Sequence, residues 1–185
     1  MGKYFFAIIL LFFTMNVYSQ QQIEGFWNIK LGERESIVIS SVKKQYPNAK
    51  FDDDIVGKPF RVKKPYLAGI EMDVCEFSFS NNIFVKAEFD KGDAKIIPEY
   101  ELQSFVSKME QDLLPYFSQL VNLISSKYGT PIMGGDSALW RSSNGNTIII
   151  KSKTTTNREV FDNGMVWTYY GLTVIYTKGV HVNDF

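Results

Sequence analysis

The chain has 185 residues, of which 15% are aromatic, and its 20 basic side chains balance its 20 acidic ones. This length can bury one substantial core or two small ones packed together. The balanced charge argues against nonspecific nucleic-acid binding, which needs a basic excess to release counterions.

Residues 1–19 have the pattern of a cleaved signal peptide. Lys3 precedes the apolar run Phe5–Phe13, and Val17-Tyr18-Ser19 places a small residue at the expected cut before Gln20. The run is shorter than the roughly 20 apolar residues that span a bilayer, so no integral membrane span is expected. The alternative is an uncleaved N-terminal anchor. We expect a soluble protein that is periplasmic or secreted, without a lipid anchor, because no cysteine lies near the cut.

Cys75 is the only cysteine, so no disulfide can form within the chain. It lies in the apolar segment "DVCEFSFS". We expect a buried structural thiol rather than a reactive one.

The first half of the chain predicts a strand, a helix and a hairpin. Residues 24–31 indicate a short strand, and a helix over Glu33–Tyr46 follows, with Val38 and Val42 on one apolar stripe. Pro47 ends this helix. Residues 48–65 form a polar connection.

The turn of the following hairpin, within residues 66–90, can be predicted from the alternation of apolar and polar residues along its two strands. A three-residue loop, Ser80-Asn81-Asn82, pairs Phe79 with Ile83 and Phe77 with Val85 and joins the apolar side chains on one buried face. A two-residue loop puts them on opposite faces. At Val74-Cys75 the alternation of apolar and polar residues changes phase, which indicates a bulge or a strand buried on both faces.

A second helix and further strands follow a linker at 91–100. The helix runs from about Glu101 to Tyr128, with Pro115 either kinking it or starting another helix, and Gly129 in a left-handed conformation after it. Asn144-Gly145 predicts a type I′ turn, which pairs Trp140 with Ile149.

The segment 157–178 predicts one or two more strands. Val166, Thr168 and Tyr170 alternate with Trp167 and Tyr169, which places the two sets on opposite faces. Gly171 marks a possible bulge.

The predicted fold is α+β. Two tandem units, 20–90 and 101–185, each contain a helix and an antiparallel meander; together they form a sheet with the helices packed on one face. The sequence "IKLGERESIVISSVKKQYP" (29–47) is similar to the opening of outer-membrane assembly lipoprotein domains of the SmpA/OmlA type. "YFSQLVNLISSKYGTP" (116–131), followed by "ALWR" (138–141), resembles the same pattern again. Two such units resemble the tandem helix-on-sheet repeats of beta-lactamase inhibitory proteins. The chain departs from the lipoproteins in having no lipobox cysteine.

The sequence predicts no catalytic residues, no cofactor and no metal site. His181 is the only histidine and lies four residues from the C-terminus, a poor place for a general base. One histidine and one cysteine cannot build a zinc site. The run Asp52–Asp54 lacks the ligand spacing of a calcium loop and is interpreted as a solvated acidic loop.

A small hydrolase is the rival interpretation, because glycosidase chemistry needs two carboxylates across a cleft. The candidate carboxylates are Glu71, Asp73, Glu76 and Glu88. The basic cluster 61–64 is interpreted as a solvated loop, with a contact to an acidic partner as the alternative.

The C-terminal strands carry more aromatic rings than one face of a small sheet easily buries. We therefore expect a binding surface among Trp140, Trp167, Tyr169 and Tyr170, on the concave face near the first three. The preferred function is a non-catalytic interaction module whose partner is another envelope or secreted protein.

Overall fold

The structure is a computed structural model that describes residues 22–52, 59–158 and 164–179. The predicted signal peptide, Asp53, Asp54 and His181 lie outside the described residues. Within the described ranges, no helix is both long enough and apolar enough to cross a membrane.

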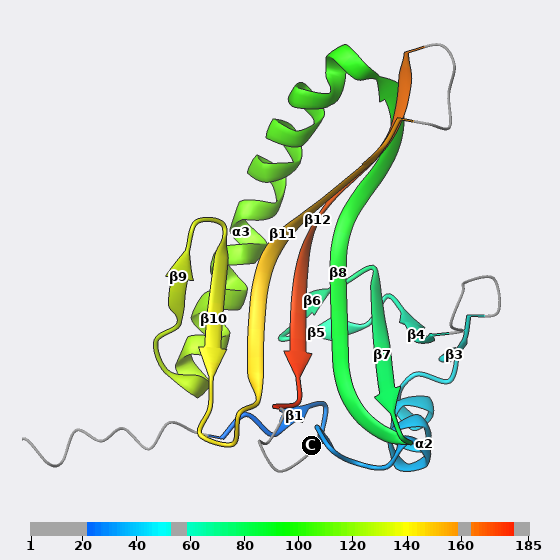
Figure 1. Cartoon of the computed structure of the whole chain (residues 1–185), viewed down its shortest axis with the longest axis vertical. Helices are drawn as coiled ribbons and strands as arrows, with labels where there is room; N and C mark the ends of the chain where they lie inside the picture. The colour runs from blue at the N-terminus through cyan, green and yellow to red at the C-terminus, as the bar shows by residue number, and fades with distance from the viewer. Residues whose placement is uncertain (1–21, 53–58, 159–163, 180–185) are drawn as a thin grey trace, which may run out of the picture.

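One eight-stranded antiparallel sheet dominates the fold, in the order β3-β4-β7-β8-β12-β11-β10-β9 (Figure 1). Its strands in chain order are β3 (Lys50–Phe51), β4 (Phe60–Lys63), β7 (Val74–Ser80), β8 (Ile83–Pro98), β9 (Ile132–Gly134), β10 (Ser137–Arg141), β11 (Thr147–Asn157) and β12 (Met165–Thr177). The α+β class is therefore as predicted, with both halves of the chain contributing to a single sheet.

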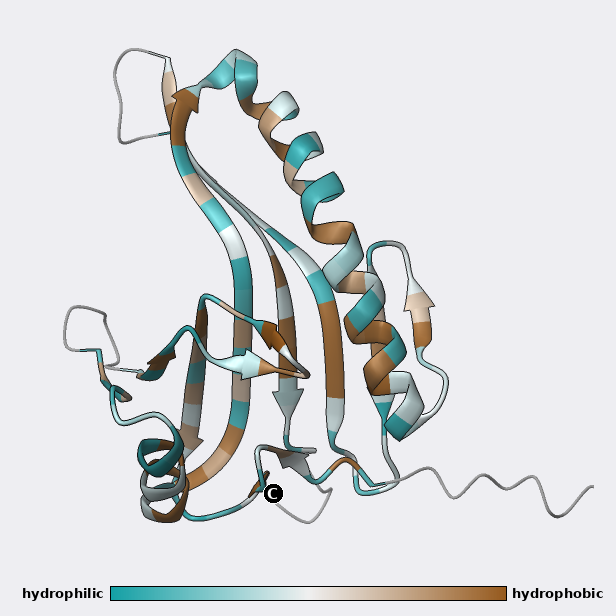
Figure 2. Cartoon of the chain, turned by 180° about the vertical axis from the view of Figure 1, so that it is seen from behind, coloured by the Kyte–Doolittle hydropathy of each residue, from teal (hydrophilic) through white to brown (hydrophobic). Residues whose placement is uncertain are grey.

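Both long helices lie on the same face of this sheet, as expected (Figure 2). They are α2 (Glu35–Gln45) and α3 (Leu102–Tyr128), the latter preceded by a short 3₁₀ turn at Glu99–Glu101. Val38 and Val42 of α2 are buried, as the stripe predicted. We call this side of the sheet the covered face.

The core lies between the helices and the covered face, and it is closed by two small hairpins. One is formed by β1 (Gly25–Phe26) and β2 (Ile29–Lys30), the other by β5 (Tyr66–Leu67) and β6 (Ile70–Glu71). Phe26 places its ring 4.9 Å from that of Phe89 and 5.0 Å from that of Tyr176. The strand expected at 24–31 is thus a hairpin, whose turn residues Trp27 and Asn28 have positive φ.

Helix α3 is a single helix that contains Pro115, so the proline starts no second helix. Gly129 follows it with a positive φ of 84°, as the sequence predicted, but its ψ of −169° lies outside the left-handed helical region. Its carbonyl accepts a hydrogen bond of 2.9 Å from Nε1 of Trp140. The end of α3 is therefore tied directly to strand β10.

The linker predicted at 91–100 is wrong, because residues 91–98 continue β8. Strand β8 has 16 residues and pairs with β12 from Lys86 to Pro98 without a register shift. Charged side chains made this segment resemble a connection. Residues 91–98 pair only with β12, since the pairing with β7 ends at Asp90, and none of their side chains is buried, so a polar sequence can continue the strand.

The predicted turn of the β7–β8 hairpin is also wrong. The turn has two residues, Asn81 and Asn82, with φ of 50° and 60°, and Ser80 pairs with Ile83. Positive φ at both positions is the type I′ geometry that matches strand twist.

The longer loop was predicted because a two-residue turn would put the apolar side chains of the two strands on opposite faces. A β-bulge in the hairpin removes this conflict. Between Ser78 and Phe79 the register shifts, so Phe79 pairs with Phe84 and Phe77 pairs with Ala87. Phe84 is fully buried, whereas Ile83, Val85 and Phe79 are only partly buried. The phase break at Val74-Cys75 has another cause, since β6 ends at Glu71 and β7 is a separate strand.

The β10–β11 hairpin differs from its prediction by one residue. The Gly145 amide donates to the Ser142 carbonyl and the Ser142 amide to the Asn146 carbonyl, both at 3.0 Å, which closes a three-residue loop. Trp140 consequently pairs with Ile148 rather than Ile149. The shift buries Ile148 and turns Ile149 to the other face.

Strand β12 is continuous, with no bulge at Gly171. The predicted alternation is confirmed: Val166, Thr168 and Tyr170 are buried on the covered face, whereas Trp167 and Tyr169 point to the opposite face and are partly buried.

Candidate functional site

The face of the sheet opposite the helices carries no helix or other strand among the residues that the structure describes (Figures 1 and 2). We call it the open face. An antiparallel sheet tolerates one solvated face when that face is polar. The open face is polar on only one half.

A single row of side chains crosses the open face through all eight strands. Directly paired residues point to the same face, so the row follows from the register. In sheet order from β9 to β3 it comprises Ile132, Leu139, Ile149, Ile175, Glu88, Glu76, Arg61 and Lys50. The first four, which we call the aliphatic row, lie on strands β9 to β12. The last four are charged.

The charged half is held together by ion pairs. Nζ of Lys153 lies 3.0 Å from Oε1 of Glu88 and 3.8 Å from Oδ2 of Asp90, and Nζ of Lys86 lies 3.0 Å from the other Glu88 oxygen. Glu76 lies directly opposite Glu88, a like-charge pairing that by itself destabilises a sheet. The neighbouring cations offset this repulsion.

Arg61 forms the other ion pairs of this charged half. Its guanidinium pairs with Glu76 and, at 2.8 Å, with Oδ2 of Asp52. Asp52 is therefore part of an ion pair on the sheet rather than of a freely solvated loop.

Two carboxyls of the charged half have pKa values shifted in opposite directions. Burial alone would raise the pKa of Glu88, but hydrogen bonds from the Lys153 and Lys86 ammonium groups outweigh it and lower that pKa. For Asp90 burial dominates and raises the pKa, even though the Thr173 hydroxyl donates to its Oδ1 at 2.5 Å.

Tyr169 covers two glycines that pair across β12 and β8. A Cβ on Gly171 would lie 2.5 Å from Cζ of the Tyr169 ring, and one on Gly92 would lie 2.8 Å from its hydroxyl oxygen. That hydroxyl is buried and has no hydrogen-bond partner among the described residues. Burial, with Asp90 and Asp73 nearby, raises the pKa of Tyr169, so the group stays protonated.

The four aromatic residues predicted to bind a partner are divided between the two faces. Trp167 and Tyr169 lie on the open face, and Trp167 pairs with Ile96, which is 53% exposed. Trp140 and Tyr170 lie on the covered face and are 1% and 5% exposed. The expectation that Trp140 shares a surface with Trp167 and Tyr169 is therefore wrong, because the one-residue register shift of β10 against β11 directs Trp140 into the core.

Cys75 and the candidate carboxylates Asp73 and Glu71 also have defined places in the structure. Cys75 is fully buried, and burial raises the pKa of its thiol, in agreement with a structural role. Asp73 accepts a 2.7 Å hydrogen bond from the Gly92 amide, and Glu71 accepts one of 3.1 Å from the Tyr66 hydroxyl. The described residues contain no group of three potential metal ligands.

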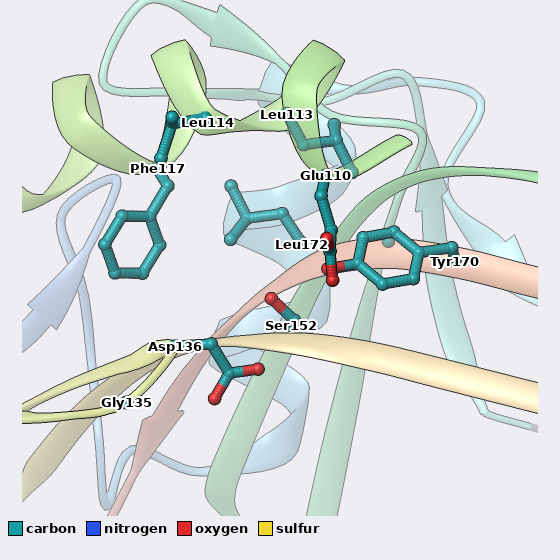
Figure 3. A pocket seen from close by; sticks show the side chains of 10 residues that line it. Glu110, Leu113, Leu114, Phe117, Gly135, Asp136, Ser152, Tyr170 and Leu172 are labelled. Carbon is teal, nitrogen blue, oxygen red and sulfur yellow. The ribbon is translucent and has the colours of Figure 1, made fainter. Parts of the chain in front are cut away.

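A cleft of about 210 Å³ lies on the covered face, between the middle of α3 and strands β11 and β12 (Figure 3). Its walls combine apolar and acidic side chains, including Leu114 and Phe117 with Glu110 from α3 and Asp136 from the β9–β10 turn. The Tyr170 hydroxyl donates to Oε1 of Glu110 at 3.5 Å. Sequence reasoning did not identify this cleft.

The aliphatic row was also missed, although part of its signal is in the sequence. The run Ile148-Ile149-Ile150 places an isoleucine on each face of a strand whichever register is chosen. A strand with only one buried face would have a polar middle residue. The cleft has no comparable signal, because its residues come from four separate segments.

Comparisons with known proteins identify no relative: no family model, no curated protein and no solved structure matches this chain.

Proposed function

We propose that the protein is an exported, non-catalytic interaction module that binds another envelope or secreted protein through the open face of its sheet. The main support is the aliphatic row, which lies on the face that neither helix covers. Apolar side chains gathered on an exposed surface commonly belong to an interaction site. Trp167 and Tyr169 lie on the same face of β12, separated from Ile175 by Thr173 and Gly171. Aromatic side chains are favoured anchors at interfaces.

The charges beside the aliphatic row indicate the chemistry of the partner. Arg141 follows Leu139 and Lys151 follows Ile149 on the same face, and both are exposed. Neither forms an ion pair with another described residue. A complementary partner presents apolar side chains flanked by carboxylates.

We further propose that the two halves are repeats of one unit. Each half contains a helix followed by strands of the large sheet: α2 precedes β3, β4, β7 and β8, and α3 precedes β9, β10, β11 and β12. The last strands of the halves, β8 and β12, pair at the centre. This order is what a tandem of the SmpA/OmlA type, related to the beta-lactamase inhibitory proteins, leads us to expect.

A hydrolase is the second candidate, because the carboxyls of Glu88 and Asp90 lie together on the open face, with Nζ of Lys153 3.0 Å from the first and 3.8 Å from the second. Glycoside hydrolysis commonly uses a pair of carboxyl groups. Chromogenic glycosides provide the test: cleavage by the wild type that Asp90→Asn abolishes supports the hydrolase, and no cleavage favours the interaction module.

Affinity capture with matched variants tests the interaction module. The chain without residues 1–19 is immobilised and exposed to soluble and membrane fractions of the cells that produce it. We expect a protein that the wild type retains and that Ile149→Asp and Trp167→Ala release. Leu123→Asp, at a 42% exposed position of α3, is the control and should retain it. Equal capture by all variants would place the binding surface elsewhere.

A further inference from the structure

The cleft beside α3 carries negative charge that no cation of the described residues neutralises through an ion pair. Glu110 and Asp136 come from different elements, are both exposed, and form no ion pair with any described residue. None of the residues that line the cleft is basic. A ligand that enters it meets two carboxylates, which favours a cation.

Hydroxyl groups add hydrogen-bond acceptors around the same hollow. Figure 3 shows Ser152 and Tyr170 near Glu110, with Asp136 across from them. An ammonium group has three donors and no acceptor, so carboxylate and hydroxyl oxygens arranged on several sides suit it. Tyr170 is 5% exposed and already bonded to Glu110, which keeps its oxygen in place.

The rest of the cleft is apolar and small. Leu113 and Leu172 are buried within it, Phe117 is partly buried, and Leu114 is 61% exposed at its edge. Its volume of about 210 Å³ is below the roughly 300–1,000 Å³ of sites for drug-sized ligands. It suits one short aliphatic chain, whose methylenes would cover Leu114 and Phe117.

We propose that this cleft binds a primary ammonium group carried on a short aliphatic chain, either the side chain of a lysine or a free alkylamine. The ammonium lies between Glu110 and Asp136, and the chain lies against Leu114 and Phe117. The site is on the covered face and therefore does not depend on the function proposed for the open face.

Nuclear magnetic resonance titrations of the chain without residues 1–19 test this site with matched probes. Hexylammonium is the test ligand; hexanoate and hexanol have the same chain with a negative or neutral head. We expect hexylammonium to shift the amide signals of Glu110, Ser152 and Tyr170 and to bind about fivefold more tightly than hexanol, the factor that one favourable ion pair contributes at the upper end of its usual range. Acetyl-lysine methylamide distinguishes the sources: binding as tight as hexylammonium favours a protein lysine, and weaker binding favours a free amine.

Variants at exposed positions test the effect of each side chain on binding without disturbing the fold. Glu110→Gln and Asp136→Asn should each weaken hexylammonium binding about threefold to fivefold, and Leu114→Ala should weaken it as well. Asp112→Asn removes the same charge from an exposed position of α3 outside the cleft and should have no effect. Hexanoate binding as tightly as hexylammonium, or unchanged binding in Glu110→Gln, would overturn the proposal.

Discussion

The Tyr169 ring lies over Gly171, two residues further along the same strand, and occupies the space that a side chain at Gly171 would take. Glycine in a strand interior weakens pairing because it has no side chain to pack. Here the ring of Tyr169 covers both Gly171 and its partner Gly92. The three residues explain why β12 passes this point without a bulge.

Gly171→Ala should destabilise the protein by about 1–3 kcal/mol, the usual cost of overpacking. The atoms nearest the new Cβ all belong to Tyr169. In a Tyr169→Ala background the same substitution should therefore cost nothing or gain up to about 1 kcal/mol, since alanine suits a strand better than glycine. Urea titration of the four proteins in this double-mutant cycle measures the coupling.

Gly92→Ala is the control for that cycle. Its Cβ would meet backbone, including the Gly171 Cα at 2.6 Å and the Tyr170 carbonyl oxygen. Tyr169→Ala should not rescue it. Rescue of both glycines, or of neither, would mean that the ring does not cover Gly171 as described.

Tyr169→Phe should stabilise the protein by about 1 kcal/mol, because it removes a buried hydroxyl that has no partner among the described residues. Tyr170→Phe is the matched change on the other face, where the hydroxyl donates to Glu110, and should be neutral or slightly destabilising. The midpoint of urea unfolding checks both. A loss above about 1 kcal/mol in Tyr169→Phe would show that its hydroxyl has a partner.

The two tryptophans of the predicted binding surface should behave differently. Trp140→Ala should cost about 3–5 kcal/mol, because it removes a core ring and its hydrogen bond to Gly129. Trp167→Ala should change the free energy of unfolding by less than about 1 kcal/mol, because its ring lies on the open face. Thermal or urea denaturation decides this. Similar losses at both positions would contradict the assignment of Trp140 and Trp167 to opposite faces.

The sequence predicted the helices well because each has a long apolar stripe and a clear end. Pro47 and Gly129 stop α2 and α3 within one or two residues of the expected positions. Strand register was less predictable. Val85 enters a β-bulge and Asn146 closes a three-residue loop, and neither feature has a signal in the local apolar pattern.

The candidate site depends on those same registers. The one-residue shift at Ile148 and Ile149 decides which isoleucine joins the core and which joins the open face. It also decides that Trp140 is buried. Sequence alternation alone assigned Trp167 and Tyr169 correctly to one face, because β12 is regular throughout. Which face the helices cover follows only from tertiary packing.

Lys153→Met should destabilise the protein at pH 7 by about 1–2 kcal/mol, because it removes the cation between Glu88 and Asp90. The folded-state pKa of Glu88 is lowered, so its contribution is present above its unfolded pKa and is lost as pH falls through the folded value. The raised pKa of Asp90 acts in the opposite direction, towards lower stability as pH rises.

Without Lys153, both carboxyl pKa values rise, so the cost of the substitution should shrink when both groups are protonated, near pH 3. Urea titrations at pH 7 and pH 3 measure the difference. Lys151→Met, on the same face but outside the ion pairs, should show little effect at either pH. An equal cost of Lys153→Met at both values would mean that packing of the lysine stem, rather than its charge, stabilises the sheet.

The most direct test of the open face as the binding surface is photo-crosslinking in the cells that produce the protein. A benzophenone amino acid is placed at Ile149 or Trp167 on the open face, or at Leu123 on the exposed side of α3. We predict an adduct with one acidic partner protein from Ile149 and Trp167, and none from Leu123. An adduct that forms only from Leu123 would contradict the open face as the binding surface.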